Sequence, residues 1–205
     1  MPSAHWPQNH LELIAQFEKR HAHPEVGGLL FFAVWAVDSL YYLSDLDQVL
    51  NPAKVIVGTH SADVVDVAHA RWAVTTCITA LDLCAAGLAR AFSGHAHKRE
   101  IALGDLDVTR DAKRKQKRAA LLRRTFPAKA RQWTDNVLAD PGYTQIKTAR
   151  DALTHARLPR HLNAPRKRIR LQVADDQIDV GAIVETAKRV GFKHVSRLLI
   201  ILQRL

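Results

Sequence analysis

Three side chains close together in the sequence could do chemistry: Arg150, Asp151 and His155. Histidine is the side chain best able to accept and donate a proton near neutral pH. Arginine carries a permanent charge and offers a planar fork of donors to the negative charge that develops on a reacting phosphate. Asp151 could orient Arg150 or His155 by a hydrogen bond. These three residues form the candidate catalytic set.

An arginine followed five positions later by a histidine is not a rare pattern in this chain. With 19 arginines and 11 histidines in 205 residues, about one such pair is expected by chance. The chain has three: Arg90 with His95, Arg150 with His155, and Arg189 with His194. A glycine interrupts the first and the third pair. The second alone lies in an uninterrupted helical pattern, with a polar residue directly after the arginine.

A helix end is predicted close to His155. Pro159 follows it, and the proline ring would clash with the carbonyl of residue 155 if the helix continued. A helix terminus beside a basic loop is a place where a histidine can meet solvent and substrate.

The run from Arg150 to Pro159 resembles the hallmark of the HEPN family (higher eukaryotes and prokaryotes nucleotide-binding). Members are helical bundles with an arginine, usually a polar residue next, and a histidine four to six residues after the arginine, near the end of a late helix. Arg150, Asp151 and His155 match this pattern. The resemblance implies metal-independent cleavage of RNA at a homodimer interface, with no cofactor. Many members are thought to be non-catalytic binding modules.

The spacing of the pair favours a dimer on geometric grounds. Five residues along an α-helix rotate by about 500°, so Arg150 and His155 point roughly 140° apart. One copy does not aim both side chains at one phosphate unless the last turn is distorted. Two copies that meet across a two-fold axis can place both pairs in one cleft.

The positive charge of the chain is concentrated in two segments. Residues 110–131 hold ten basic side chains and one acid, Asp111, and so carry +9 of the net +10. A second cluster between residues 157 and 170 holds six basic side chains and no acid. A focused positive field suits a polyanion, because each neutralised phosphate releases counterions. The predicted nucleic-acid-binding residues are Arg110, Lys113, Arg114, Lys117, Arg118, Arg123, Arg124, Arg157 and Arg160.

The hydrophobic periodicity predicts an all-α fold in one domain over residues 1–205, and the resemblance implies that it is a HEPN-like helical bundle. Its core is expected at about 10–160, with a small β-hairpin and a C-terminal helix added over 168–205. Helices are expected from Leu11 to before Pro24, from Gly27 to Leu50, from an N-cap at Ser61 to Phe92, over 110–138 with a possible break at Pro127, over 143–155, and over 180–204. Residues 95–109 are predicted to be a loop, Asp140 to Gly142 a turn, and Asn51 and Pro52 an interruption. Trp6, Trp35, Trp72 and Trp133 are expected to be packing residues.

The composition restricts the cellular compartment in which the protein is expected. Two cysteines exclude a disulfide scaffold and a four-thiolate zinc site, which favours a reduced, cytoplasmic protein. The most apolar stretch, Val26 to Val37, is too short to span a bilayer, so no membrane partner is expected. No signal peptide, metal site or cofactor loop is recognisable.

Three functional hypotheses remain open. The first is an endoribonuclease of HEPN type, acting as a homodimer on RNA, with a toxin or defence role and an antitoxin partner as one setting. The second is a non-catalytic bundle that binds RNA or a partner protein. The third is a basic DNA-binding regulator, for which the segment from Val190 to Leu198 is a weak helix-turn-helix candidate.

Overall fold

The structure of the chain is a computed structural model. It describes residues 6–7, 9–21, 24–54, 59–93, 101–109, 112–155, 170–173 and 176–204. At residues 24, 43–54, 59–67, 154–155, 170–173 and 176–180 the description covers the backbone alone.

The described chain is built almost entirely of helices, which confirms the all-α class. Two short strands lie between the sixth and the last helix. In chain order the elements are α1 (His10–His21), α2 (Pro24–Lys54), α3 (Thr59–Ser93), the 3₁₀-helix η1 (Leu103–Leu106), α4 (Lys113–Arg123), α5 (Ala128–Leu138), α6 (Pro141–His155), β1 (Arg170–Val173), β2 (Asp176–Asp179) and α7 (Val180–Leu202).

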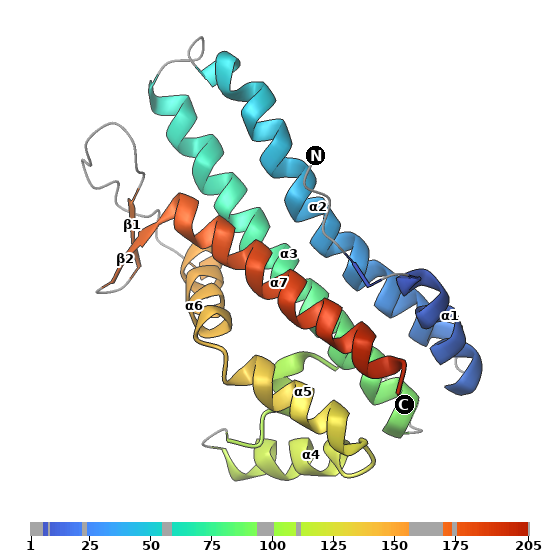
Figure 1. Cartoon of the computed structure of the whole chain (residues 1–205). Helices are drawn as coiled ribbons and strands as arrows, with labels where there is room; N and C mark the ends of the chain where they lie inside the picture. The colour runs from blue at the N-terminus through green and yellow to red at the C-terminus, as the bar shows by residue number, and fades with distance from the viewer. Residues whose placement is uncertain are drawn as a thin grey trace.

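Two long antiparallel helices, α2 and α3, form the centre of the molecule, and α7 lies along both of them (Figure 1). Their contact surfaces are apolar: Leu30 and Val37 of α2, Leu81 of α3 and Leu198 of α7 are buried. Small side chains on α3, such as Ala80, let the helices approach closely. The core therefore extends beyond the expected 10–160, because α7 is one of its central elements.

The remaining elements surround this three-helix centre. α1 packs on α2 and α7, and α6 packs on α3 and α7. α4 and α5 lie at one end of the molecule, far from the strands (Figure 1). β1 and β2 pair antiparallel, with Arg170 opposite Asp179 and Val173 opposite Asp176.

Two predicted boundaries in the first half of the chain are wrong. α2 begins at Pro24 and continues through Asn51 and Pro52 to Lys54, so these residues do not interrupt it. Pro52 has no N–H to donate to the carbonyl of residue 48, and α2 extends only two residues beyond it, to Lys54. α3 begins at Thr59, which places Ser61 inside the helix and not at its N-cap.

In the second half of the chain the breaks follow the prolines. The basic region is two helices, α4 and α5, separated at Pro127 as the sequence allowed. α6 extends to His155, the last residue before a segment outside the described residues, so the predicted helix end stays a prediction. Its start differs from the prediction, because Pro141 and Gly142 form its first turn. Proline is well suited to the first helical position, and the Asp140 carboxylate accepts the Gly142 N–H at 2.8 Å.

Residues 101–109 contain structure where only a loop was expected. Leu103 and Leu106 of η1 are fully buried. The N–H of Leu103 donates to the carboxylate of Asp82 on α3 at 2.8 Å. The N–H of Ala102 donates to Asp105 at 3.2 Å. These bonds fix the segment across the surface of α3.

Candidate functional site

α6 positions the candidate catalytic residues. Its inner face carries Ile146 and Ala149, which are buried, and Arg150 follows at the edge of that face. The Arg150 side chain is 33% exposed and that of Asp151 is 48% exposed. The Arg150 guanidinium donates from Nε and Nη2 to Oδ1 of Asp151, at 2.9 and 2.6 Å. The arginine is thus held by its own neighbour at the protein surface.

His155 is the last residue of α6, and only its backbone is among the described atoms. Arg157 and Arg160 lie outside the described residues, as does Arg110. The structure therefore brings Arg150 and Asp151 together and places His155 at the helix terminus. Because all five intervening steps are helical, the two Cα–Cβ directions diverge by roughly 140° within one chain.

Asp82 of α3 is an ionisable neighbour of Arg150 that sequence reasoning missed. Burial raises the pKa of its carboxyl, while the Leu103 N–H and the charge of Arg150 act in the opposite direction. No ion pair between Asp82 and Arg150 is present within 4 Å among the described side chains. The signal was available in the sequence, since Asp82 is a lone acid between Leu81 and Leu83 on an apolar helix.

A second candidate surface is formed by α4 and the start of α5. One side of α4 is packed, with Ala119 and Leu122 buried. Residues 112–138 contain nine basic side chains and one acid, Asp135. No described acid forms an ion pair with any of the exposed basic side chains of this surface. We call this set the cationic surface: Lys113, Arg114, Lys115, Lys117, Arg118, Arg124, Lys129 and Arg131.

Arg123 was expected to face nucleic acid, and the structure corrects this. Its side chain is 9% exposed and pairs with Asp135 at 2.7 Å. It also donates to the carbonyl oxygens of Leu106 and Arg131, at 3.5 and 3.4 Å. Arg123 therefore joins α4, η1 and α5 to one another. It is a structural residue, because its donors are directed inward.

The third arginine–histidine pair also lies in an unbroken helix, because α7 continues through Gly191, so the expected interruption is wrong. The two side chains nevertheless lie in different surroundings. Arg189 is exposed, whereas His194 is 1% exposed. Nε2 of His194 lies 2.8 Å from Oδ2 of Asp140, which also accepts from Lys193 at 2.7 Å. The carbonyl of His194 accepts the indole N–H of Trp133 at 2.8 Å. These contacts lock α5, α6 and α7 together.

Ionisation states in this junction follow from burial and hydrogen bonding. Burial lowers the pKa of His194, and the Asp140 carboxylate only partly offsets that effect. Burial acts to raise the pKa of Asp140, but hydrogen bonds from Lys193, His194 and the Gly142 N–H hold it well below its usual range. Since the carboxylate is an acceptor only, neutral His194 donates to it from Nε2. Nδ1 is then buried with no partner among the described atoms.

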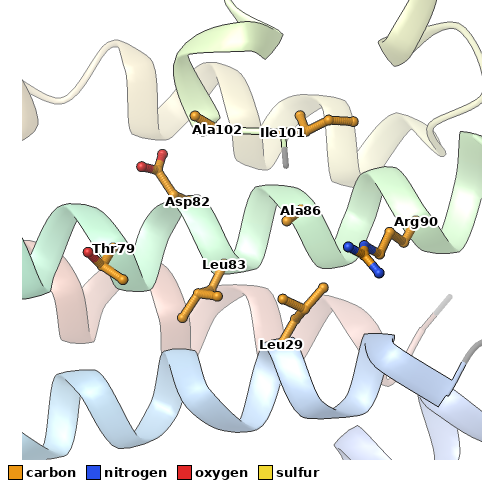
Figure 2. A pocket seen from close by; sticks show the side chains of 8 residues that line it. All are labelled: Leu29, Thr79, Asp82, Leu83, Ala86, Arg90, Ile101 and Ala102. Carbon is orange, nitrogen blue, oxygen red and sulfur yellow. The ribbon is translucent and has the colours of Figure 1, made fainter. Parts of the chain in front are cut away.

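An open groove of about 490 Å³ lies between α2, α3 and the start of the 101–109 segment, close to Asp82 (Figure 2). Its floor is mostly apolar, and its polar side chains come from α3. Arg90, at one end, forms an ion pair with Glu25 of α2. The lining residues are Leu29, Thr79, Asp82, Leu83, Ala86, Arg90, Ile101 and Ala102.

The outer side of α2 carries a row of exposed aromatic side chains. Trp35 is 62% exposed, so the expectation that it packs in the core is wrong, whereas Trp133 is fully buried as expected. Phe32 contacts both Phe31 and Trp35 at ring-centroid distances of 6.0 and 6.1 Å. α2 is apolar on every side, so its sequence gives no period that separates the inner face from the outer one.

Neither a metal centre nor a decisive membrane signal emerges from the described part of the chain. No group of three or more histidine, cysteine, aspartate or glutamate side chains there is arranged to hold a metal ion. One segment, Ala68–Ser93, is long and apolar enough to cross a membrane. Two thirds of its most apolar window is buried inside the bundle, and the core helix of a soluble protein passes the same test.

Comparison with known proteins adds no relative from which a function could be transferred. No protein-family model matches the chain, no curated protein matches it, and no solved structure has a matching fold.

Proposed function

We propose that the protein binds single-stranded RNA through the cationic surface and cleaves it at Arg150 and His155, as a HEPN-like homodimer. The observation that carries the proposal is the cationic surface itself. Eight basic side chains are exposed there without an acidic partner among the described residues, while the one acid of α5, Asp135, is occupied by Arg123. A mixed surface would serve solubility better, so the single sign points to a polyanion.

The proposed reaction needs only protein side chains. The ribose 2′-oxygen attacks the adjacent phosphorus, and the bond from phosphorus to the 5′-oxygen breaks. His155 accepts the 2′-hydroxyl proton, and the imidazolium of a second His155 protonates the leaving 5′-oxygen. The products are a 2′,3′-cyclic phosphate and a 5′-hydroxyl. Arg150 stabilises the extra negative charge on the phosphorus-centred transition state.

The helical geometry supports the proposed homodimer. The full rate uses two imidazoles, one as base and one as acid, and each chain carries one His155. With one imidazole missing, water takes over its proton transfer and the reaction is slower. Arg150 and His155 of one chain diverge around α6. A two-fold axis near the C-terminal end of α6 would bring the arginine of one copy beside the histidine of the other.

A specific observation favours a second candidate, an RNA-binding bundle that does not cleave. Arg150 is already paired with Asp151, and this neutralises the charge that the transition state would need. In that case the cationic surface retains its role and His155 only ends the helix. The two candidates make the same prediction for binding and opposite predictions for cleavage.

The binding claim is tested with two matched double variants of the full chain. Arg114→Ala/Arg118→Ala removes two exposed arginines from α4, and Arg189→Ala/Arg197→Ala removes two from α7. Affinity for a single-stranded RNA is measured as a function of salt. The α4 variant is expected to lower the slope of log affinity against log salt by about 0.7 for each lost phosphate contact. The α7 variant is expected to leave it unchanged, and equal effects of the two variants would refute the assignment of the surface.

The cleavage claim is tested with His155→Ala in the presence of EDTA. Wild-type protein is expected to cleave and to leave a cyclic phosphate, and the variant is expected to bind RNA normally without cleaving it. Binding without cleavage by the wild-type protein at every pH would establish the second candidate. Loss of cleavage in EDTA would refute the metal-independent mechanism.

A further inference from the structure

The groove beside Asp82 has the form of a small-ligand site. Its volume of about 490 Å³ falls within the range of ligand pockets, and it combines an apolar floor with a few polar groups. Thr79, Asp82, Ala86 and Arg90 recur at intervals of three and four residues along α3, so they share one face of the helix (Figure 2). Leu29 of α2 adds to the apolar side of the groove.

We propose that this groove holds a guanine base of the RNA, with the Asp82 carboxylate as the acceptor for its donor edge and Arg90 directed to its phosphate. The inference deepens the proposed function and rests on it for its biological meaning. It assigns the preferred nucleotide, which neither the cationic surface nor the catalytic pair can select, because both act on the backbone.

The carboxylate of Asp82 is held in place before any ligand arrives. Its Oδ1 accepts the Leu103 N–H at 2.8 Å, which ties the acid to the 101–109 segment. Oδ2 makes no hydrogen bond with any described donor. An ionised carboxylate accepts hydrogen bonds and donates none. It therefore selects a ligand edge that offers donors.

The four bases differ in what they offer to such an acceptor. Guanine presents two adjacent donors, the ring N1–H and the exocyclic amino group. Adenine and cytosine present an amino group beside a ring acceptor. Uracil presents one N–H between two carbonyl oxygens, which a carboxylate repels. Asp82 should thus bind guanine most tightly and uracil most weakly.

The length of the groove fits a nucleotide. Asp82 and Arg90 are eight residues apart, which corresponds to about 12 Å along the helix, and their side chains extend from this separation into the groove. Arg90 is paired with Glu25, whose side chain is 59% exposed. A phosphate can displace this exposed carboxylate, because arginine binds phosphate through two parallel hydrogen bonds. The apolar side chains between them would contact the faces of the base and sugar.

The experiment is calorimetric titration of the full chain with GMP, AMP, CMP and UMP in the millimolar range at low salt. Non-specific attraction to the cationic surface is the same for all four, so selectivity is the measured quantity. GMP is expected to bind at least about tenfold more tightly than UMP, since a hydrogen bond to a charged group is worth that factor or more. Asp82→Asn, whose amide oxygen can still accept the Leu103 N–H, is expected to abolish the preference.

Two further variants complete the design. Ala86→Leu places additional atoms in the groove and is expected to weaken binding of every nucleotide to a similar, non-specific level. Glu12→Gln removes one carboxylate from the exposed face of α1 and is expected to leave the preference for GMP intact. Equal affinities for the four nucleotides, or no binding by the wild-type chain, would overturn the inference. Because no RNA and no cleavage are involved, this result is independent of the tests of the proposed function.

Discussion

Arg150 donates two hydrogen bonds, from Nε and Nη2, to one carboxylate oxygen of Asp151, the next residue along α6. The arrangement leaves Nη1 and the second carboxylate oxygen for other partners. It fixes the guanidinium at the surface of α6, where a transition-state anion would compete with Asp151. In the proposed function, the balance between these two anions would determine whether the site cleaves RNA or only binds it.

Asp151→Asn is expected to raise RNA affinity severalfold, because Arg150 regains its full charge toward phosphate. Fold stability should change by no more than about 1 kcal/mol, since both side chains are partly exposed and such pairs contribute little. RNA titration and urea unfolding measure the two quantities. A fall in affinity would show that Asp151 positions Arg150 for RNA and does not compete with it.

Arg123→Ala is expected to destabilise the fold by about 1–3 kcal/mol, because it leaves the carbonyl oxygens of Leu106 and Arg131 without their donor. Arg124→Ala, at the adjacent exposed position, is the matched control and should stay within about 0.5 kcal/mol of wild type. Chemical denaturation provides the comparison. Equal stabilities of the two variants would contradict the structural role assigned to Arg123.

Acidification from pH 7 to pH 5 is expected to lower the free energy of unfolding. Burial lowers the pKa of His194 in the folded chain below its ordinary value of 6.5. Below pH 6.5, His194 therefore binds a proton more readily in the unfolded chain than in the folded chain, and this difference favours unfolding. Above pH 6.5 this histidine does not reduce the free energy of unfolding. Below pH 6.5 the free energy of unfolding falls by at most about 1.4 kcal/mol per pH unit for one histidine. Urea unfolding at several pH values measures the slope.

His194→Gln supplies the control for this pH dependence. The glutamine amide can still donate to Asp140 but does not titrate, so the slope between pH 5 and 7 should decrease. It should not vanish, because burial also lowers the pKa of His21. An unchanged slope in the variant, or a wild-type protein that becomes more stable on acidification, would contradict the assignment.

The boundaries that sequence could predict are those set by local chemistry. The break at Pro127 follows from proline, which disrupts helices within a few residues of itself. The burial of Arg123 could also be predicted from the residues near it in the sequence. Ala119, Leu122, Arg123 and Phe126 recur at helical spacing, so the arginine lies on the packed face of α4.

Other features depend on contacts between residues distant in the chain. The Leu103 N–H bonds Asp82 across 21 positions, so no local pattern indicates that the 101–109 segment closes one side of the groove. His194 and Asp140 are separated by 54 positions, and their contact makes the third arginine–histidine pair structural. The exposure of Trp35 could not be predicted from the sequence, because α2 is apolar on every side.

The most direct test of the central claim is complementation between two inactive variants. Arg150→Ala and His155→Ala are each expected to bind RNA without cleaving it. After the two are mixed and allowed to exchange subunits, a heterodimer contains the intact arginine of one chain beside the intact histidine of the other. Cleavage is expected to reappear in the mixture, at a rate below that of wild type because one imidazole is missing. A mixture that stays inactive while wild-type protein cleaves would show that the two residues do not share a site across a two-fold axis.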